Sequence, residues 1–328
     1  MLNPNLKLNS KIFEAEPETK ATRDGFGTAL LTLGEKDANI VVLTADLSES
    51  TRTEAFAKKF PERFIECGVA EQNMVAIAAG LAASGKIPFV SSYATFSPGK
   101  NWETIRTTVV YNRANVKIAG HHSGIMTGPD GSTHQATEDI AITRCWPGIQ
   151  VIVPCDSIEA HKATEKAGTT EGPIYLRFSR DKSVVMTTEE TPFDGRVQEF
   201  WVSDNPVATI FGTGHELFHA LLAAKELETE GVNVSVVNVA SVKPLDEEGI
   251  LKMIEVSGAA VSVEDHQVMG GLGGALAELF AKKKPIPMEF IGLQDTFAES
   301  GSPKEIIEKY GMGKEAIKSA VKRVIFRK

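Results

Sequence analysis

The segment from residue 64 to residue 96 constrains the fold more than any other part of the chain. Two short apolar segments, Phe64-Ile65 and Ile87–Tyr93, flank an apolar run from Met74 to Ala83. The run is apolar nearly all round, which predicts a helix buried in the centre of a large fold. The flanking segments predict strands, so the sequence indicates a strand–helix–strand unit in a sheet that is covered on both faces.

Apolar strands and helical patterns alternate along the rest of the chain. A second, smaller series of strands and helices begins near Val207. The alternation predicts two doubly wound α/β domains with mostly parallel sheets, whose ligands bind at the carboxyl ends of the strands. We divide the chain into an N-terminal arm (1–20), a first domain (21–186), a polar linker (187–206) and a second domain (207–328).

The composition excludes several classes of protein. The net charge of −8 argues against broad binding to nucleic acid or to membrane surfaces. No apolar run approaches the roughly 20 residues of a membrane span, and the N-terminus lacks the apolar core of a signal peptide. The three cysteines have no metal-ligand spacing, which indicates free thiols in a reducing cytoplasm.

Glu71 and Phe96 stand at the two ends of the strand–helix–strand unit. Glu71 precedes the apolar helix, where a carboxylate compensates the helix dipole; alternatively, burial makes this carboxylate protonatable. Position alone favours the first interpretation. Phe96 and Trp102 are either core aromatics or the wall of a ligand pocket.

A glycine-rich loop, residues 123–133, follows a predicted strand and has a histidine on each side. Such a loop predicts a binding site rather than a regular element. His122 and His134 suit acid–base work or the binding of hydroxyl groups, although each is equally compatible with a structural role. Zinc is disfavoured, because no third ligand lies at a recognisable spacing, and we predict no metal site. The neighbouring His121 receives no role.

Arg23, Ser50 and Arg180 lie at strand and helix ends that the alternation places on one side of the sheet. Each is unremarkable alone, but together they predict an anion site for a phosphate group. The glycines of 270–274 lack a GxGxxG pattern with a following acid, so helix–sheet packing explains them better than nucleotide binding.

Several segments, taken together and in this order, resemble the C-terminal half of transketolases: ADLSES, ECGVAEQNM, ATF, GPDGSTHQ, LRFSR and VEDHQVMGGLGGALAEL. The likeness runs from about Lys20 to beyond Gly301. It is strongest to the second subunit of split, two-subunit transketolases, which depend on thiamine diphosphate. The resemblance implies a pyrimidine-binding domain followed by a C-terminal domain.

One expected motif is missing. Thiamine-diphosphate enzymes hold the diphosphate and Mg²⁺ with a GDG segment followed about 30 residues later by Asn; here Asp130-Gly131 follows Pro129 and no such Asn comes after. The resemblance therefore implies an N-terminal partner subunit that binds most of the diphosphate and Mg²⁺, in an α2β2 heterotetramer.

The resemblance also implies roles for cofactor-binding residues. Glu71 matches the glutamate that hydrogen-bonds the aminopyrimidine ring and drives the proton exchange that makes the thiazolium carbon nucleophilic. Phe96 matches the aromatic residue that packs on this ring. Asp46 and Leu47 lie in the loop near the thiazolium. Trp102 takes one of two following positions that are usually aromatic; Gly99 occupies the other and departs from the pattern.

Substrate-binding residues follow from the same resemblance. His122 and His134 match catalytic histidines that bond the hydroxyls and carbonyl of the sugar, and Asp130 matches an aspartate near those hydroxyls. The group that binds the sugar phosphate corresponds to Arg23, Ser50, His134 and Arg180.

The expected activity is transfer of a two-carbon ketol unit from a ketose phosphate, such as xylulose 5-phosphate, to an aldose phosphate, as in the pentose phosphate pathway. Three alternatives stay open. They are a 1-deoxyxylulose-5-phosphate synthase-like enzyme, a 2-oxo-acid dehydrogenase β subunit, and a non-catalytic assembly subunit. The histidine pair favours a sugar acceptor, because 2-oxo-acid dehydrogenase β subunits usually lack a double-histidine loop.

Overall fold

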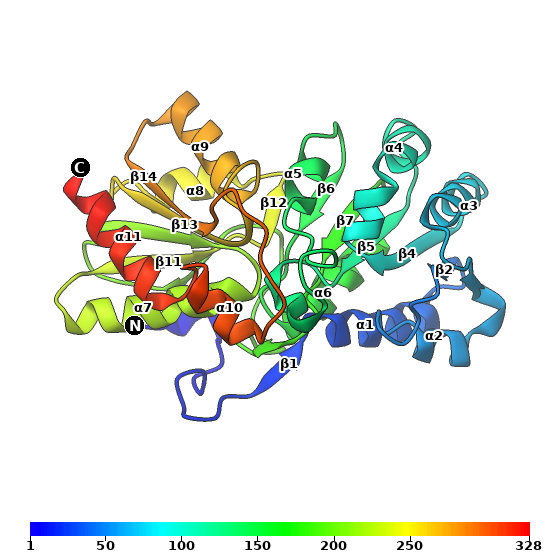
Figure 1. Ribbon diagram of the computed structural model, residues 1–328, viewed down its shortest axis with the longest axis horizontal. Coiled ribbons are helices and arrows are strands. Elements are labelled where there is room, and N and C mark those ends of the chain that lie inside the picture. Colours follow the sequence, from blue (N-terminus) through cyan, green and yellow to red (C-terminus); the bar gives the residue numbers. More distant parts are fainter.

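The computed structural model describes residues 1–328 as two α/β units that lie side by side along the long axis of the molecule (Figure 1). The first unit contains a seven-stranded sheet in the order β12-β6-β7-β5-β4-β2-β3, parallel except for β12. Its strands are β2 (Ile40–Thr44), β3 (Phe64–Glu66), β4 (Ile87–Tyr93), β5 (Lys117–His121), β6 (Gln150–Ile152), β7 (Ile174–Arg177) and β12 (Ser241–Lys243).

Helices cover both faces of this sheet, because alternate strand residues are apolar on each side. One core packs β-strand residues against α1, α2 and α6, and the other packs them against α3, the π-helical turn η4 and α5. The helices are α1 (Thr22–Lys36), α2 (Glu54–Lys59), α3 (Glu71–Ala83), α4 (Trp102–Thr104), η4 (Ile105–Val110), α5 (Asp139–Arg144) and α6 (Ser157–Thr169).

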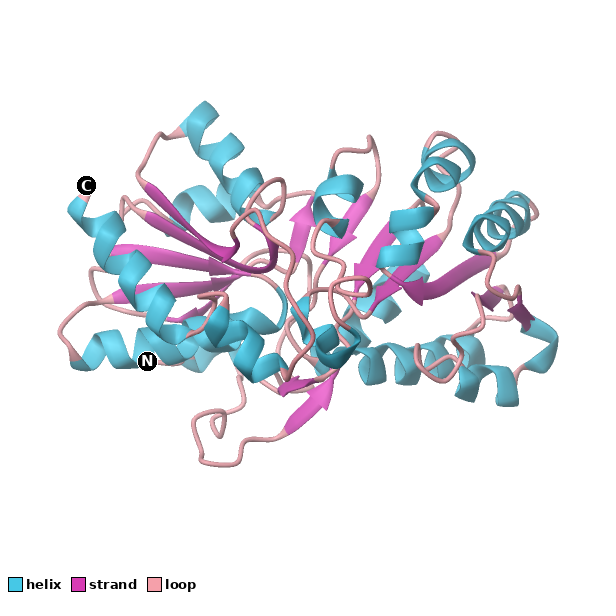
Figure 2. Cartoon of the chain, viewed as in Figure 1, coloured by secondary structure: helices cyan, strands magenta, loops and turns pink.

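The second unit repeats this plan around a five-stranded sheet in the order β14-β13-β10-β11-β9, parallel except for β9. Its strands are β9 (Gln198–Trp201), β10 (Ala208–Gly212), β11 (Val234–Asn238), β13 (Ala260–Gln267) and β14 (Met288–Leu293). Its helices are α7 (Leu217–Thr229), α8 (Glu247–Met253), α9 (Leu272–Lys283), α10 (Pro303–Lys309) and α11 (Lys314–Phe326). Residues from α7 and α11 pack into one core, and residues from α8 and α9 into the other. The predicted fold class, two doubly wound α/β domains, is confirmed (Figure 2).

Besides the short strands β1 (Thr19–Ala21) and β8 (Lys182–Val184), three strands were not predicted. β9 lies inside the stretch assigned as a linker, β14 follows α9 where only helices were expected, and β12 is a three-residue strand that leaves the second unit to join the first sheet. Their sequences are short or mixed in polarity, because edge strands are only partly covered. The N-terminus of α6 is capped by the carboxylate of Asp156, which accepts hydrogen bonds from Ile158 N and Glu159 N.

The N-terminal arm begins on the second unit and crosses to the first (Figure 1). Asn3 N donates a hydrogen bond to Phe200 O, and Leu2 forms an isolated antiparallel β-bridge with Trp201. Ile12 is buried in the core of the second unit. The arm then reaches β1 (Thr19–Ala21), which pairs with β8 (Lys182–Val184). None of the helices is both long enough and apolar enough to cross a membrane.

A buried carboxylate joins the two units. Glu159 of α6 accepts hydrogen bonds from Cys155 N (2.6 Å) and from Asn238 Nδ2 of β11 (2.7 Å). Burial, reinforced by the neighbouring Asp156, raises the pKa of Glu159 to about 7. The proton on this carboxyl group is therefore linked to the stability of the junction.

Substituting Glu159→Gln should remove this linkage. The folded chain holds a proton on Glu159 from pH 4.5 to about 7 that the unfolded chain releases. The unsubstituted chain should therefore lose about 3 kcal/mol of stability relative to the variant as the pH rises through that window. Thermal unfolding midpoints of both chains at pH 5, 6, 7 and 8 measure the difference.

The exposed Glu190→Gln variant is the control, and its curve should run parallel to that of the unsubstituted chain. A difference between the unsubstituted and Glu159→Gln chains that stays constant from pH 5 to 8 would contradict the prediction.

Candidate active site

The predicted site residues meet at one edge of the first sheet. The loop with Asp46, Leu47 and Ser50 follows β2, Phe96 follows β4, His122 follows β5, and Arg180 follows β7. These four strands are parallel, so their carboxyl ends lie together. Arg23 joins them from the first turn of α1.

An aromatic cluster occupies the centre of this edge. The ring of Tyr93, the last residue of β4, stacks on His122 at a centroid distance of 3.8 Å and on Phe96 at 5.9 Å. His134 approaches the edges of both rings, at 5.6 Å from Phe96 and 6.0 Å from Tyr93. The sequence predicted three of these four residues and missed Tyr93; its position at the end of β4, three residues before Phe96, was the available indication.

His122 is neutral in this environment. It is buried, it has a left-handed backbone (φ 52°), and its Nδ1 has no hydrogen-bond partner. Burial, together with the positive charges of Arg23 and Arg180, lowers the pKa of His122 to about 3. A neutral imidazole donates one hydrogen bond and accepts one, which suits a hydroxyl or carbonyl ligand.

Cationic side chains surround the cluster. Arg23 Nη1 donates to Ser50 O (2.8 Å), and Arg180 Nη1 donates to Thr127 O (2.9 Å) and lies 3.8 Å from Asp130 Oδ1. Burial and the adjacent Arg52 lower the pKa of Arg23. Arg52, which has φ 64° and bonds Asp24, was not singled out from the sequence. Concentrated positive charge at the mouth of a buried site favours an anionic ligand.

Glu71 is the first residue of α3, and only 1% of its surface is exposed. Its Oε2 accepts a hydrogen bond from Lys100 Nζ (2.9 Å), and its carbonyl accepts one from Asn101 Nδ2 (3.1 Å). Both donors come from the segment around η3 (Thr95–Lys100), which also carries Phe96. Glu71 and Phe96 are thus joined through this segment. The burial of Glu71 agrees with the second of the two interpretations of this residue, and its partner Lys100 was not predicted.

The helix α3 is less buried than its composition predicted. Met74, Val75 and Ala78 pack into the core, whereas Ala76, Gly80 and Ala83 are exposed. The expectation of burial all round is wrong for this chain, because only one face of the helix meets the sheet.

The remaining predicted residues lie at the margin. Asp46 adopts φ 60° and its N–H donates to Glu66 Oε1 (2.7 Å), which fixes the loop that also carries Leu47. Trp102 packs on Trp146 (5.3 Å) and donates to Ile142 O (2.9 Å), so it contacts the core rather than the aromatic cluster. His121 packs against Phe26 (4.9 Å) and bonds Ser91 Oγ (2.9 Å), which indicates a structural role.

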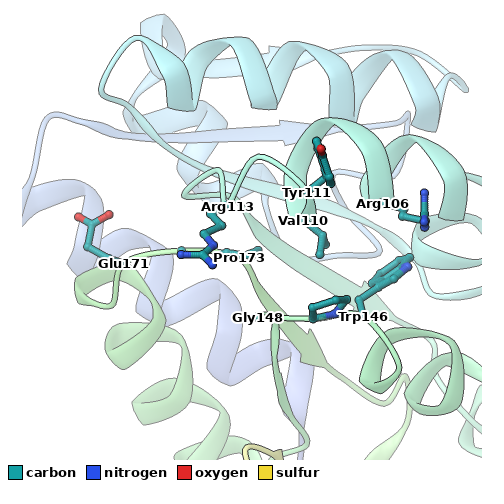
Figure 3. Close-up of a pocket in the computed structure, with 10 residues that line it drawn as sticks. Arg106, Val110, Tyr111, Arg113, Trp146, Gly148, Glu171 and Pro173 are labelled. Atoms are coloured by element: carbon teal, nitrogen blue, oxygen red, sulfur yellow. The ribbon is translucent and has the colours of Figure 1, made fainter.

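A separate cavity lies away from these residues. It has a volume of about 600 Å³ (Figure 3). Its lining includes Arg106 of η4, and Arg113, Trp146 and Glu171 from the loops that precede β5, β6 and β7. In Figure 3, Glu171 stands at one end of it and Arg106 with Trp146 at the other. It therefore opens at the opposite edge of the sheet, and none of the predicted site residues lines it.

Two family models match the chain. Residues 18–184 match the transketolase, pyrimidine binding domain, and residues 201–317 match the transketolase, C-terminal domain.

Two relatives and one solved structure resemble the chain over most of its length. A putative transketolase C-terminal section of Methanocaldococcus jannaschii is 43% identical over 91% of this chain and 94% of its own. The 6-deoxy-6-sulfo-D-fructose transketolase subunit SqwH of Clostridium sp. is 37% identical over 96% and 98%. A split gene transketolase, solved as an inactive β4 tetramer, superposes with a TM-score of 0.87 at 42% identity, over 93% of this chain and 98% of its own.

The low pKa of His122 leads to a direct prediction. In spectra of the ¹⁵N-histidine-labelled chain, the imidazole of His122 should remain neutral from pH 8 to pH 5, because burial and two arginines oppose its protonation. Arg23→Gln should raise this pKa, since it removes one of the charges.

Arg113→Gln, which removes a charge from the distant cavity, is the control and should leave the pKa of His122 unchanged. The His122 resonance is assigned by its loss in His122→Gln. Titration near pH 6.5 in the unsubstituted chain would refute this account of the site.

Proposed function

The chain belongs to the transketolase family, and we propose that it is the subunit of a two-part enzyme that transfers a two-carbon ketol unit between sugar phosphates. One observation carries the proposal. The buried carboxylate of Glu71, joined to the segment of Phe96, lies on the same sheet edge as a neutral His122, His134 and the cations Arg23 and Arg180.

The residues around Glu71 fit the pyrimidine half of thiamine diphosphate, the cofactor of the family. The carboxylate is buried, and its only side-chain partner is Lys100, whose side chain is 46% exposed and free to leave. Thr95 Oγ1 and Asn101 Oδ1 are buried nearby without hydrogen-bond partners. Glu71 would hold a proton shared with the ring, and Phe96 would pack on its face. When bound, the cofactor supplies the carbon nucleophile that carries the two-carbon unit.

The other half of the cofactor site belongs, in this proposal, to an N-terminal partner subunit that binds the diphosphate and Mg²⁺. The chain holds no group of three or more His, Cys, Asp and Glu side chains placed to hold a metal ion. The exposed face of α3, with Ala76, Gly80 and Ala83, allows close approach of another chain to the helix that begins at Glu71. We propose an α2β2 assembly in which that approach completes the site.

The substrate end of the site is proposed from charge and hydrogen bonding. Arg23, Arg180 and the Ser50 loop would hold the phosphate, and His122, His134 and Asp130 would bond the hydroxyls and carbonyl of the sugar. We propose xylulose 5-phosphate as donor and an aldose phosphate as acceptor, as in the pentose phosphate pathway.

A sulfonated sugar is a second candidate substrate, because the cations would hold a sulfonate as well as a phosphate. It is the substrate class named for the Clostridium relative.

We also propose that the enzyme acts in the cytoplasm. Its cysteines, Cys67, Cys145 and Cys155, form no disulfide, as expected of a protein in a reducing compartment.

Reconstitution tests the function. The chain, mixed with the N-terminal subunit, thiamine diphosphate and Mg²⁺, should transfer a ketol unit from xylulose 5-phosphate to ribose 5-phosphate, measured by coupled assay. Glu71→Gln should lower kcat by at least about 100-fold while leaving the circular dichroism spectrum unchanged, because the proton transfer is lost.

Glu103→Gln, an exposed residue of α4, is the matched control and should keep full activity. Sulfofructose as donor tests the second candidate. Decarboxylation of pyruvate without ketol transfer would favour a 1-deoxyxylulose-5-phosphate synthase-like or 2-oxo-acid dehydrogenase enzyme. If neither reaction occurs, the remaining alternative is a non-catalytic assembly subunit.

A further inference from the structure

The loop between His122 and His134 is held by the second domain. Its 3₁₀ segment, η5 (Ile125–Asp130), begins with Ile125 and Met126, and both side chains are buried in the core built mainly by the second domain. On the other side, Thr127 Oγ1 donates to His122 O (2.6 Å), and Thr127 O accepts from Arg180 (2.9 Å). The loop therefore connects the second domain to the sugar-phosphate site.

Asp265 is the polar anchor of this connection. It lies on β13 and is buried, and its Oδ1 accepts from Ile125 N (2.8 Å) while its Oδ2 lies 3.4 Å from Met126 N. A Cβ on Gly124 would lie only 2.0 Å from Asp265 Oδ2, so only glycine allows this approach. Gly124 also has φ 73°, which L side chains rarely adopt.

The side chains of His215 and Arg177 hold Asp265 in place. His215 Nε2, of the turn η6 (Gly214–Glu216), lies 2.9 Å from Asp265 Oδ2. Arg177 of β7 donates to Asp265 O (2.8 Å) and to Ala136 O (3.2 Å), at the far end of the same loop. Burial alone would raise the pKa of Asp265, but the bonds from His215 and the charge of Arg177 lower it, so the anchor is a carboxylate.

We propose that Asp265 is a positioning residue for the sugar-phosphate site, fixing the loop of residues 123–131 so that His122 and Arg180 keep their arrangement. Asp265 touches neither substrate nor cofactor; it acts through the amides of Ile125 and Met126. The inference rests on the proposed function and extends it, because it gives the second domain a part in substrate binding.

Asp265→Asn tests the inference in the reconstituted α2β2 enzyme. The amide nitrogen of Asn cannot accept a hydrogen bond, so one of the anchoring contacts is lost. The KM for xylulose 5-phosphate should rise about tenfold or more, because the loop loses its fixed position. The dissociation constant of thiamine diphosphate, measured by titration calorimetry, should be unchanged, since Glu71 and Phe96 are held by other elements.

Three further variants separate positioning from general stability. Gly124→Ala should also raise KM, because the added methyl group would displace the loop from the carboxylate of Asp265. His215→Ala should raise KM, and His215→Gln, whose amide also donates, should restore it. Asp246→Asn is the matched control: Asp246 caps α8 in the same domain through Gly249 N. It should lower the thermal midpoint without changing KM.

An unchanged KM in Asp265→Asn, or equal changes in Asp265→Asn and Asp246→Asn, would overturn the inference. Hydrogen exchange of the peptide covering residues 123–131 provides a readout that does not depend on activity. Hydrogen exchange in this peptide should be faster in Asp265→Asn than in Asp246→Asn. This difference should appear even if the assembly transfers no ketol unit. Such inactivity would count against the proposed function and not against the role of Asp265. Unchanged exchange would refute the anchor itself.

Discussion

The common direction of the strands in the first sheet is the constraint on which the candidate site depends. Parallel pairing of β2, β4, β5 and β7 brings residues as distant in sequence as Ser50 and Arg180 to one edge. Reversing any one of these strands would carry its terminal loop to the opposite ends of the strands, where the cavity lined by Arg113 and Glu171 lies. The hydrophobic cores on both faces therefore determine where the polar chemistry occurs.

Like charges within the site oppose folding. Arg23, Arg52 and Arg180 lie close enough for each to act on a neighbour, and the burial of Arg23 and His122 removes water that would screen them. The chain offsets part of this cost locally, since Asp24 pairs with Arg52 and Asp130 lies near Arg180. What remains is an electrostatic field that favours a bound anion, so the charges that oppose folding would also attract such a ligand.

Much of the fold could be predicted from the sequence, because the strands buried on both faces are continuous apolar runs. The strand Ile87–Tyr93 was located to the residue. Edge strands such as β12 could not be located, since three residues of mixed polarity carry no period, and their pairing depends on tertiary contacts.

The site residues likewise divide into those that the sequence could indicate and those that it could not. Residues with unusual chemistry at the ends of helices and strands, such as Glu71 and His122, could be singled out as candidates, helped by the resemblance to a known family. Tyr93 and Lys100 were missed, because an aromatic residue in a strand and a lysine in a loop are ordinary until their neighbours are known. The prediction that α3 is buried all round was wrong for a related reason. The sequence indicates that a helix face is apolar, but it does not indicate whether another part of this chain covers that face.

The crossing strand β12 has a consequence for synthesis of the protein. It pairs with β6 and forms one edge of the first sheet, although it is encoded within the second domain. During synthesis, the backbone groups on the outer side of β6 therefore stay unpaired until residue 243 has left the ribosome. Unpaired edge strands can pair with other chains, so the nascent first domain exposes an aggregation-prone strand during that interval. Dividing the gene between the two domains would thus leave a protein fragment that lacks one of its own strands.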